Sequence, residues 1–196
     1  MDIIEKIKQI LFDSEKFFSN LNKEKSVEEA LKFYAILAAF SAVMSFIIVL
    51  LFGDKFTNLI LNMLRINQPV PQLTTLKLFG QVVMGYIFVV IGSFVATAIL
   101  YVWLLIFKGN KGYAKAYQLY IYSSTPGLLI NWIPFASVIT WIYSFVLLVI
   151  GTKKIYNFSN TKAVLIYLIP LIIIFIIGVI FLAAAIAFLS ARGSLA

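Results

Sequence analysis

The chain has 196 residues, of which 62% are hydrophobic and 12% charged, with a net charge of +8 and a mean hydropathy of +1.00. This leaves too little polar surface for a water-soluble globule, so the sequence predicts an integral membrane protein. It contains no Cys and no His, which excludes thiol chemistry, zinc sites built on these residues and imidazole acid–base catalysis.

Residues 1–25 predict an amphipathic helix at the membrane surface. Ile3, Ile7 and Ile10 recur at three- and four-residue steps with charged residues between them, which is the period of a helix with one apolar face. The charges of this head nearly cancel, which argues against a polybasic lipid switch. They favour a helix that lies in the interface or packs under the bundle.

The first membrane-spanning helix is predicted over residues 26–53. Its start is indicated by Ser26-Val27-Glu28-Glu29, which has the pattern of a capping box. Residues 54–77 are predicted to form an outer loop, with a short interfacial helix that follows Asp54 as its N-cap and ends before Pro69 and Pro71.

Four further spans follow, and together the segments predict an all-α polytopic bundle of five transmembrane helices. Span 2 covers residues 78–107, about 45 Å if wholly helical, so it must tilt or project beyond the bilayer. A longer uncharged stretch interrupted by prolines predicts a hairpin of two short spans, 116–132 and 134–152. Span 5 covers residues 163–191, and we expect a kink at Pro170.

The basic residues predict the orientation of these spans. Of the 16 Lys and Arg, 12 fall in the head, the loop after span 2 and the loop after span 4, and 4 fall on the opposite side. Cytoplasmic loops collect Lys and Arg, so we expect a cytoplasmic N-terminus and an outside C-terminus. About 32 mostly polar residues precede the uncharged part of span 1, so no cleavable signal peptide is expected. We assign no role to residues 193–196.

The uncharged cores of the predicted spans carry no ionisable side chain, which argues against proton relays, ion pathways and coupled transport. Ser123, Ser124 and Thr125 stand just before a proline, where hydroxyls can bond carbonyls that the proline leaves free. The alternative is that these three residues line a cavity. No metal-ligand spacing or phosphate-binding loop is present, and no cofactor is expected.

A series of short motifs in the second half of the chain is recognisable. A Gly-Asn-Lys-Gly turn is followed by Tyr-Ser-Ser-Thr-Pro, a second proline, a glycine at the end of span 4, and a proline within span 5. In this order the motifs resemble the Yip (Ypt/Rab-interacting protein) domain family of five-span membrane proteins. The signature positions, which are our structural candidates, are Gly109, Gly112, Tyr122, Pro126, Pro134, Gly151 and Pro170.

The resemblance implies a non-enzymatic membrane protein. Eukaryotic members of the family reside in the Golgi and endoplasmic reticulum and associate with prenylated Rab-type GTPases. The longer head of those members and its Asp-Leu-Tyr-Gly-Pro-like motif are missing here, where the head has Asp13-Ser14. The resemblance therefore points to the compact prokaryotic branch, in the cytoplasmic membrane. A eukaryotic source would place the protein in an internal Golgi or endoplasmic reticulum membrane.

Three functions follow as hypotheses. The first is a scaffold, partner adaptor or membrane-organising factor, whose partners are the lipid bilayer, a membrane or peripheral protein, or a second copy of the chain, and no nucleic acid. The second is a transporter or permeation path for a small neutral or lipophilic solute, which a continuous polar cavity between spans 2, 3 and 5 would favour. The third is an accessory subunit of a lipid-acting complex, for which Asp13, Glu15 and Lys111 are the nearest charged set.

Overall fold

The computed structural model describes residues 2–21, 26–65 and 74–193, and every regular element in this part of the chain is a helix. The predicted all-α class is therefore confirmed. The expectations for Lys23, Lys25, Pro69 and Pro71, and for the tail after Gly193, lie outside the described residues. The chain divides into a unit of residues 1–157 and a unit of residues 158–196, which are described separately.

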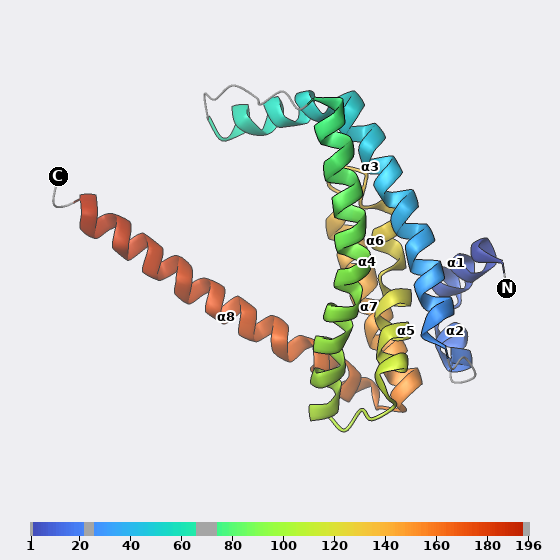
Figure 1. The fold of residues 1–196 in the computed structure, drawn as a ribbon. Coiled ribbons are helices and arrows are strands. Elements are labelled where there is room, and N and C mark those ends of the chain that lie inside the picture. The colour runs from blue at the N-terminus through green and yellow to red at the C-terminus, as the bar shows by residue number, and fades with distance from the viewer. Residues whose placement is uncertain (1, 22–25, 66–73, 194–196) are drawn as a thin grey trace. The chain divides into compact units, whose positions relative to one another are not determined.

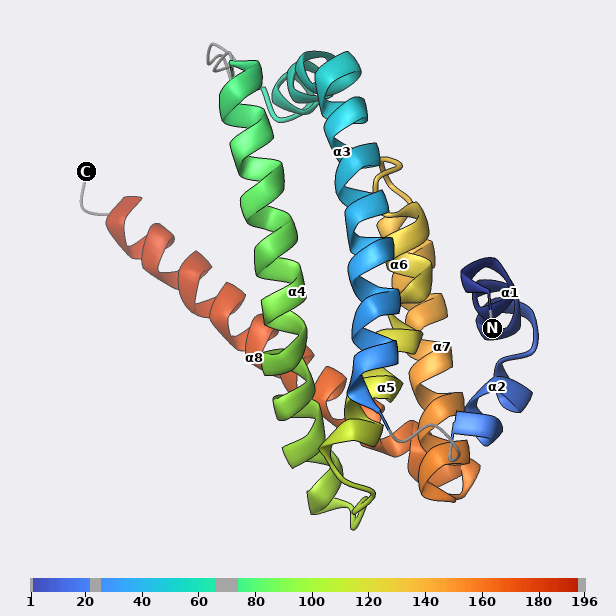
Figure 2. The same cartoon turned by 45° about the vertical axis from the view of Figure 1, so that its right-hand side comes forward.

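The head consists of two helices, α1 (Ile3–Phe12) and α2 (Ser14–Asn20), where the sequence predicted one. The break falls at Asp13, whose φ of −136° and ψ of 45° are not helical. The apolar faces of both helices turn inward, since Ile10, Phe17 and Phe18 are buried. Helix α2 packs against α7, and α1 contacts α2 and α6, so the head lies along the side of the first unit (Figure 2).

Helix α3 (Val27–Met63) begins at the predicted cap, where the Ser26 hydroxyl accepts a 3.0 Å hydrogen bond from the Glu28 amide. The predicted separate helix with Asp54 as its N-cap is wrong, because α3 continues through Gly53 and Asp54 without a break. Figure 1 shows instead that its last turns bend away from its first part. The Thr57 hydroxyl donates a 2.9 Å hydrogen bond to the Gly53 carbonyl, a type of bond that often bends helices.

Helix α4 (Thr75–Ile106) runs beside α3 (Figure 1) and returns the chain to the end of the unit at which α3 begins. It starts three residues before the predicted span 2. A tight turn ends it, in which Lys108 has a φ of 64° and the Gly109 amide donates a 2.9 Å hydrogen bond to the Leu104 carbonyl. Left-handed backbone of this kind commonly terminates helices.

The predicted third span is divided into α5 (Tyr113–Ser123) and α6 (Thr125–Ile130), and the predicted fourth span is α7 (Ser137–Tyr156). The division follows from Pro126, which has no amide hydrogen and whose ring is incompatible with the carbonyl four residues earlier in a continuous helix. With 11 and 6 residues, neither α5 nor α6 can cross a bilayer by itself.

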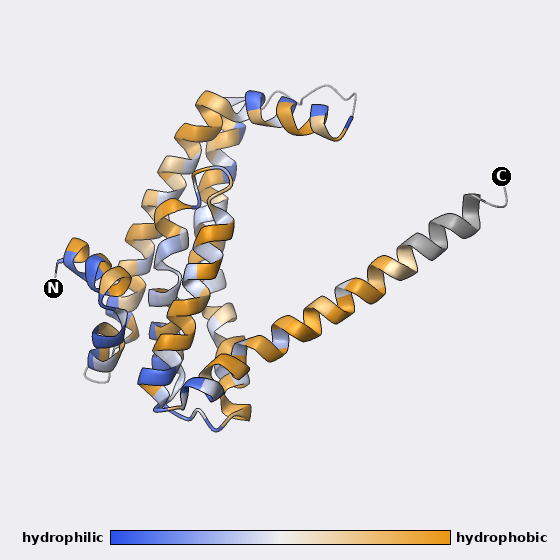
Figure 3. Ribbon diagram, turned by 180° about the vertical axis from the view of Figure 1, so that it is seen from behind, coloured by the Kyte–Doolittle hydropathy of each residue, from blue (hydrophilic) through white to orange (hydrophobic). Residues whose placement is uncertain are grey.

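Four helices of the described residues are long and apolar enough to cross a membrane, namely α3, α4, α7 and α8 (Asn160–Gly193). The prediction of five single-helix spans is thus corrected to four. Hydrophobic residues follow one another along α8 in Figure 3, while hydrophilic residues gather in the head and near the loops. Within its own unit, α8 continues through Pro170 as one helix.

Candidate functional site

Helix α5 is the centre of the first unit. It contacts α3, α4 and α7, and seven of its 11 residues are buried, among them Tyr117, Gln118 and Tyr122. A helix buried on several sides must satisfy its polar side chains from its neighbours. The partners of these side chains therefore show which segments α5 holds together.

The Tyr122 hydroxyl accepts a 2.8 Å hydrogen bond from the Lys6 ammonium of the head. The Lys6 nitrogen also lies 4.8 Å from the centre of the Tyr122 ring and 5.8 Å from that of Phe33 on α3, distances at which a cation is attracted by an aromatic face. Phe17 of α2 meets the Tyr122 ring edge-on at 5.0 Å. Tyr122, a family-signature candidate, thus joins the head to α3 and α5.

The start of α5 also binds the backbone on both sides of the link between α2 and α3. The Lys115 ammonium donates to the Leu21 carbonyl and, at 3.0 Å, to the Gln118 side-chain oxygen. The Gln118 amide nitrogen donates to the Ser26 carbonyl at 3.0 Å. Ser26 is also the cap of α3, so these bonds place the end of α2, the start of α3 and the start of α5 at one end of the unit.

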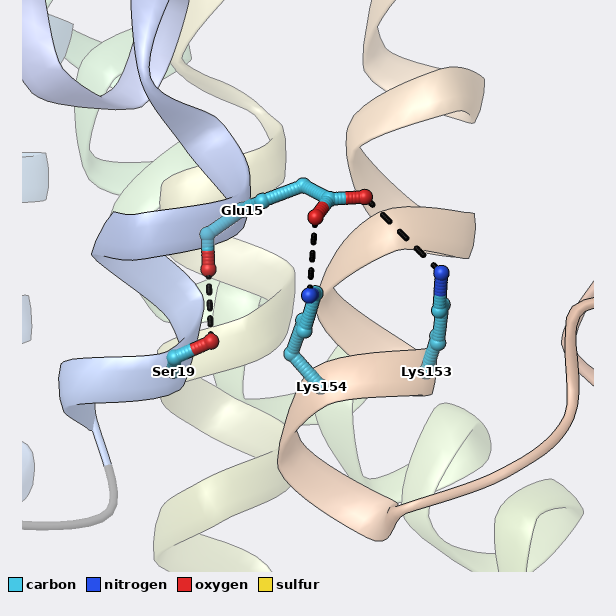
Figure 4. Close-up of polar contacts among 4 residues, drawn as sticks. All are labelled: Glu15, Ser19, Lys153 and Lys154. Carbon is cyan, nitrogen blue, oxygen red and sulfur yellow. Dashed lines mark hydrogen bonds and ion pairs between the residues drawn. The ribbon is translucent and has the colours of Figure 1, made fainter.

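Two lysines of α7 hold the head from the other side (Figure 4). The Glu15 carboxylate lies 2.8 Å from the Lys154 ammonium and 3.8 Å from that of Lys153. Both bonds draw the carboxylate of α2 toward α7, and the Ser19 hydroxyl donates to the Glu15 backbone carbonyl at 2.7 Å. The hydrogen bond and charge of Lys154, followed by the charge of Lys153, lower the pKa of Glu15 below its ordinary value.

Gly151 of α7 lies where this helix approaches α5 and α2 most closely. A Cβ atom built at Gly151 would stand 2.5 Å from the Leu119 side chain and 2.9 Å from that of Phe18. Both side chains are fully buried, so neither has free space into which to move. The glycine therefore sets the distance between the head, α5 and α7.

The glycine turn before α5 has two separate requirements. Gly112 has a φ of 84°, a conformation that is unfavourable for residues with a Cβ. Gly109 has ordinary backbone, but a Cβ there would lie 3.0 Å from the Leu104 carbonyl oxygen and 3.2 Å from the Tyr156 ring. Of the remaining signature positions, Pro126 is buried in α6, Pro134 lies in the turn between α6 and α7, and Pro170 belongs to α8.

The three hydroxyl candidates separate in the structure. Ser123 and Thr125 are buried, and their side-chain oxygens have no hydrogen-bond partner among the described residues. Ser124 lies at the junction of α5 and α6, where its hydroxyl donates a 2.8 Å bond to the Tyr120 carbonyl. Of the three, Ser124 lines the cavity described next, and a cavity-lining role of Ser123 and Thr125 stays a prediction.

This cavity, which we call the hydroxyl cavity, has a volume of about 710 Å³ and lies between α3, α4, the α5–α6 junction and α7. Most of the exposed surface of its wall is apolar, but several neutral polar side chains line it and none of the lining residues carries a formal charge. The Thr140 hydroxyl donates to the Asn131 side-chain oxygen across the α6–α7 turn. The polar residues of the wall include Tyr34, Ser41, Tyr120, Ser124, Asn131 and Thr140.

The sequence did not predict all the residues that hold the head on α5 and α7. Lys6 follows Ile3 by three residues and precedes Ile10 by four, so its place on the apolar stripe of α1 was the available signal for a buried contact. The sequence analysis singled out Glu15, but as a member of a charged set with Asp13 and Lys111. In the structure Glu15 contacts Lys153 and Lys154, Asp13 contacts Lys16 at 3.9 Å, and no described contact joins Lys111 to either acid.

The family model of the Yip1 domain matches residues 8–188 of the chain, which is nearly its whole length. The protein belongs to the Yip1-domain family. Members of this family are generally non-enzymatic membrane proteins. In this Yip1-domain protein, the signature residues Tyr122 and Gly151 lie at the contacts of α5 with the head and α7. No curated protein and no solved structure matches the chain at a significant level.

Substitution of Gly151 by Ala should lower the free energy of unfolding by about 1–3 kcal/mol, because the added methyl overpacks the contact with Leu119 and Phe18. The matched control is Gly92→Ala on α4, where a Cβ meets open space and a helical Gly-to-Ala change stabilises by about 0.5–1 kcal/mol. Thermal unfolding of the purified protein in detergent measures both. Equal midpoints for the two variants would contradict the close approach at Gly151.

The Glu15 ion pairs should make the stability of the first unit depend on pH. The pKa of Glu15 is lower in the folded state, so the stabilisation is present above the ordinary carboxyl pKa and is lost as the pH falls through the lowered value. Glu15→Gln should therefore lower the unfolding midpoint at pH 7 but have little effect near pH 2. Glu5→Gln, on the exposed side of α1, is the control and should show no such difference.

Proposed function

We propose that this Yip1-domain protein acts by contact, as a membrane-embedded scaffold or adaptor whose head (α1–α2) faces the partner. The observation that carries the proposal is how the chain uses its polar side chains. Lys6, Glu15 and Lys115 hold the head and its ends on α5 and α7. Because these charged side chains fix α1 and α2 on the surface of the unit, the two helices form a stable surface to which a partner can bind.

The outer face of the head supports a role in association. Phe12 is 85% exposed and Ile4 61% exposed, although their helix is held in place on the unit through the Leu11 carbonyl, which accepts a hydrogen bond from the Tyr143 hydroxyl. These two apolar side chains are therefore available for contact with a partner. The partner we propose is a membrane or peripheral protein, with a second copy of the chain as the alternative outcome.

We further propose that α5 and α6 cross the membrane together as one broken span. Their combined 18 positions reach about 27 Å if stacked end to end, close to the hydrocarbon thickness. The bonds from Lys115 and Glu15 support a common end for the head, the start of α5 and the end of α7. The lysines at this end favour the cytoplasmic side, and the short head, as in the compact branch of the family, favours the cytoplasmic membrane of a prokaryote.

A transporter of a small neutral or lipophilic solute is a second candidate, because the hydroxyl cavity offers neutral hydrogen-bonding groups inside an apolar unit. The cavity lies between α3, α4 and the α5–α7 hairpin, whereas the hypothesis required a polar path along spans 2, 3 and 5. An accessory role in lipid chemistry has less support, because Asp13, Glu15 and Lys111 do not form one cluster. Uptake of a labelled neutral solute by vesicles that contain the purified protein tests transport.

Reporter fusions test the proposed topology. A fusion after Lys111, between α4 and α5, should report the cytoplasm, and a fusion at the C-terminus should report the exterior, because an odd number of crossings places the two chain ends on opposite sides. A fusion at Pro134, between α6 and α7, should report the exterior. The same side for Lys111 and Pro134 would mean that α5 and α6 do not cross.

Photocrosslinking tests the adaptor function. A photoreactive residue in place of Phe12 should form an adduct with one protein in native membranes, and the added substitution Glu15→Arg should greatly weaken that adduct because the new charge faces Lys153 and Lys154. Glu5→Arg, with the same charge change on exposed α1, should leave the adduct intact. Adducts with lipid only, or an equal effect of both changes, would contradict the proposal.

A further inference from the structure

The hydroxyl cavity and a hydrophobic recess between α3 and α4 are both neighbours of a third, smaller recess. A small linking recess of about 240 Å³ shares Ser41, Val89 and Leu128 with the hydroxyl cavity. It also shares Ala42, Val82 and Tyr86 with a second recess of about 250 Å³ between α3 and α4, which we call the apolar slot. Shared walls make the three spaces neighbours along one path.

The polar end of this path has hydrogen-bonding capacity that the protein itself does not use. Among the described residues, the side-chain hydroxyls of Ser41 and Ser144 in the hydroxyl cavity and of Ser45 in the linking recess make no hydrogen bond within the protein. In an apolar environment an unsatisfied hydroxyl is costly. A ligand with hydroxyl groups, each both donor and acceptor, would satisfy them.

The other end has the opposite chemistry. The apolar slot is lined by Ala39, Val43, Phe46, Phe79 and Val83, together with the three shared residues. On its wall the Phe46 and Phe79 rings meet edge-on at 6.2 Å. Aliphatic and aromatic surface of this kind accommodates a hydrocarbon chain and offers almost nothing to a polar group.

We propose that the first unit binds an uncharged, hydroxyl-bearing acyl lipid of the monoacylglycerol or diacylglycerol class. The glycerol hydroxyls occupy the hydroxyl cavity, and an acyl chain passes through the linking recess into the apolar slot. The inference does not depend on the adaptor function, because none of its residues belongs to the head.

The chemistry of the lining residues also disfavours the binding of a phospholipid. No residue that lines any of the three spaces is Asp, Glu, Lys or Arg. An anionic phosphate placed there would lose its hydration with no cation to replace it, which is strongly unfavourable. A neutral glycerol headgroup has no such penalty, so the site should select lipids by headgroup charge.

A photoreactive diacylglycerol with a diazirine in one acyl chain tests the site on the purified full chain in detergent. Mass spectrometry should place the label on peptides that contain residues 39–46 and 79–86. Excess unlabelled monooleoylglycerol should remove this labelling, and phosphatidylglycerol with the same acyl chain should not. This competition uses the unaltered protein, so its outcome does not depend on how any variant folds.

Two leucine substitutions on α4 provide the matched control. A Cβ at either Gly80 or Gly85 meets open space, but only Gly85 lines the path. Gly85→Leu should reduce labelling of the apolar slot by at least about fivefold by filling the linking recess, and Gly80→Leu should leave it unchanged. Labelling that is removed equally by phosphatidylglycerol, that is equal in both variants, or that falls outside the two segments would overturn the proposal.

Discussion

The burial of α5 is the constraint on which the rest of the first unit depends. The buried Tyr117 and Gln118 side chains at the centre of α5 are stable in an apolar surrounding because neighbouring helices complete their hydrogen bonds. The Ser93 hydroxyl of α4 lies 3.1 Å from that of Tyr117, and the Gln118 amide reaches the Ser26 carbonyl. Each bond fixes a different neighbour relative to α5, so the positions of α3, α4 and the head follow from the needs of one short helix.

The same constraint accounts for four of the family-signature residues of this unit. Gly112 permits the left-handed start of α5, Gly151 permits α7 to approach it, and Tyr122 binds the head to it. Pro126 ends the helix by denying it the next amide hydrogen bond. These four residues therefore have one shared physical role, which is to shape the surroundings of α5.

The sequence predicted those parts of the fold that depend on local patterns. The capping pattern at Ser26 marked the start of α3, and uncharged runs marked the four long helices, because a bilayer selects for length and apolarity within one segment. The break between α5 and α6 was missed although Pro126 was noticed, since hydropathy does not register a helix interruption. At Gly53 the sequence predicted a break that the structure does not have, because a charged residue at position 54 does not by itself end a helix.

The contacts that make the candidate site were mostly beyond sequence reasoning. Lys6 and Tyr122 are 116 residues apart, and a single sequence gives no information about which of its 16 basic residues meets which aromatic ring. Glu15 was singled out for its charge, but its partners lie far along the chain on α7. The hydroxyl cavity was also hidden, because its wall is assembled from isolated Ser, Thr, Tyr and Asn residues on several helices, each unremarkable in its own segment.

The unequal lengths of the helices have a consequence for the surrounding lipid. Helix α7 has 20 residues, about 30 Å, whereas α4 has 32, about 48 Å. Lipids beside α7 and lipids beside α4 therefore meet hydrophobic surfaces of different height, which the bilayer accommodates by thinning, thickening or helix tilt at a modest energetic cost. That cost varies around the circumference of the protein, so elastic forces in the membrane itself will favour particular sides on which a neighbour can approach.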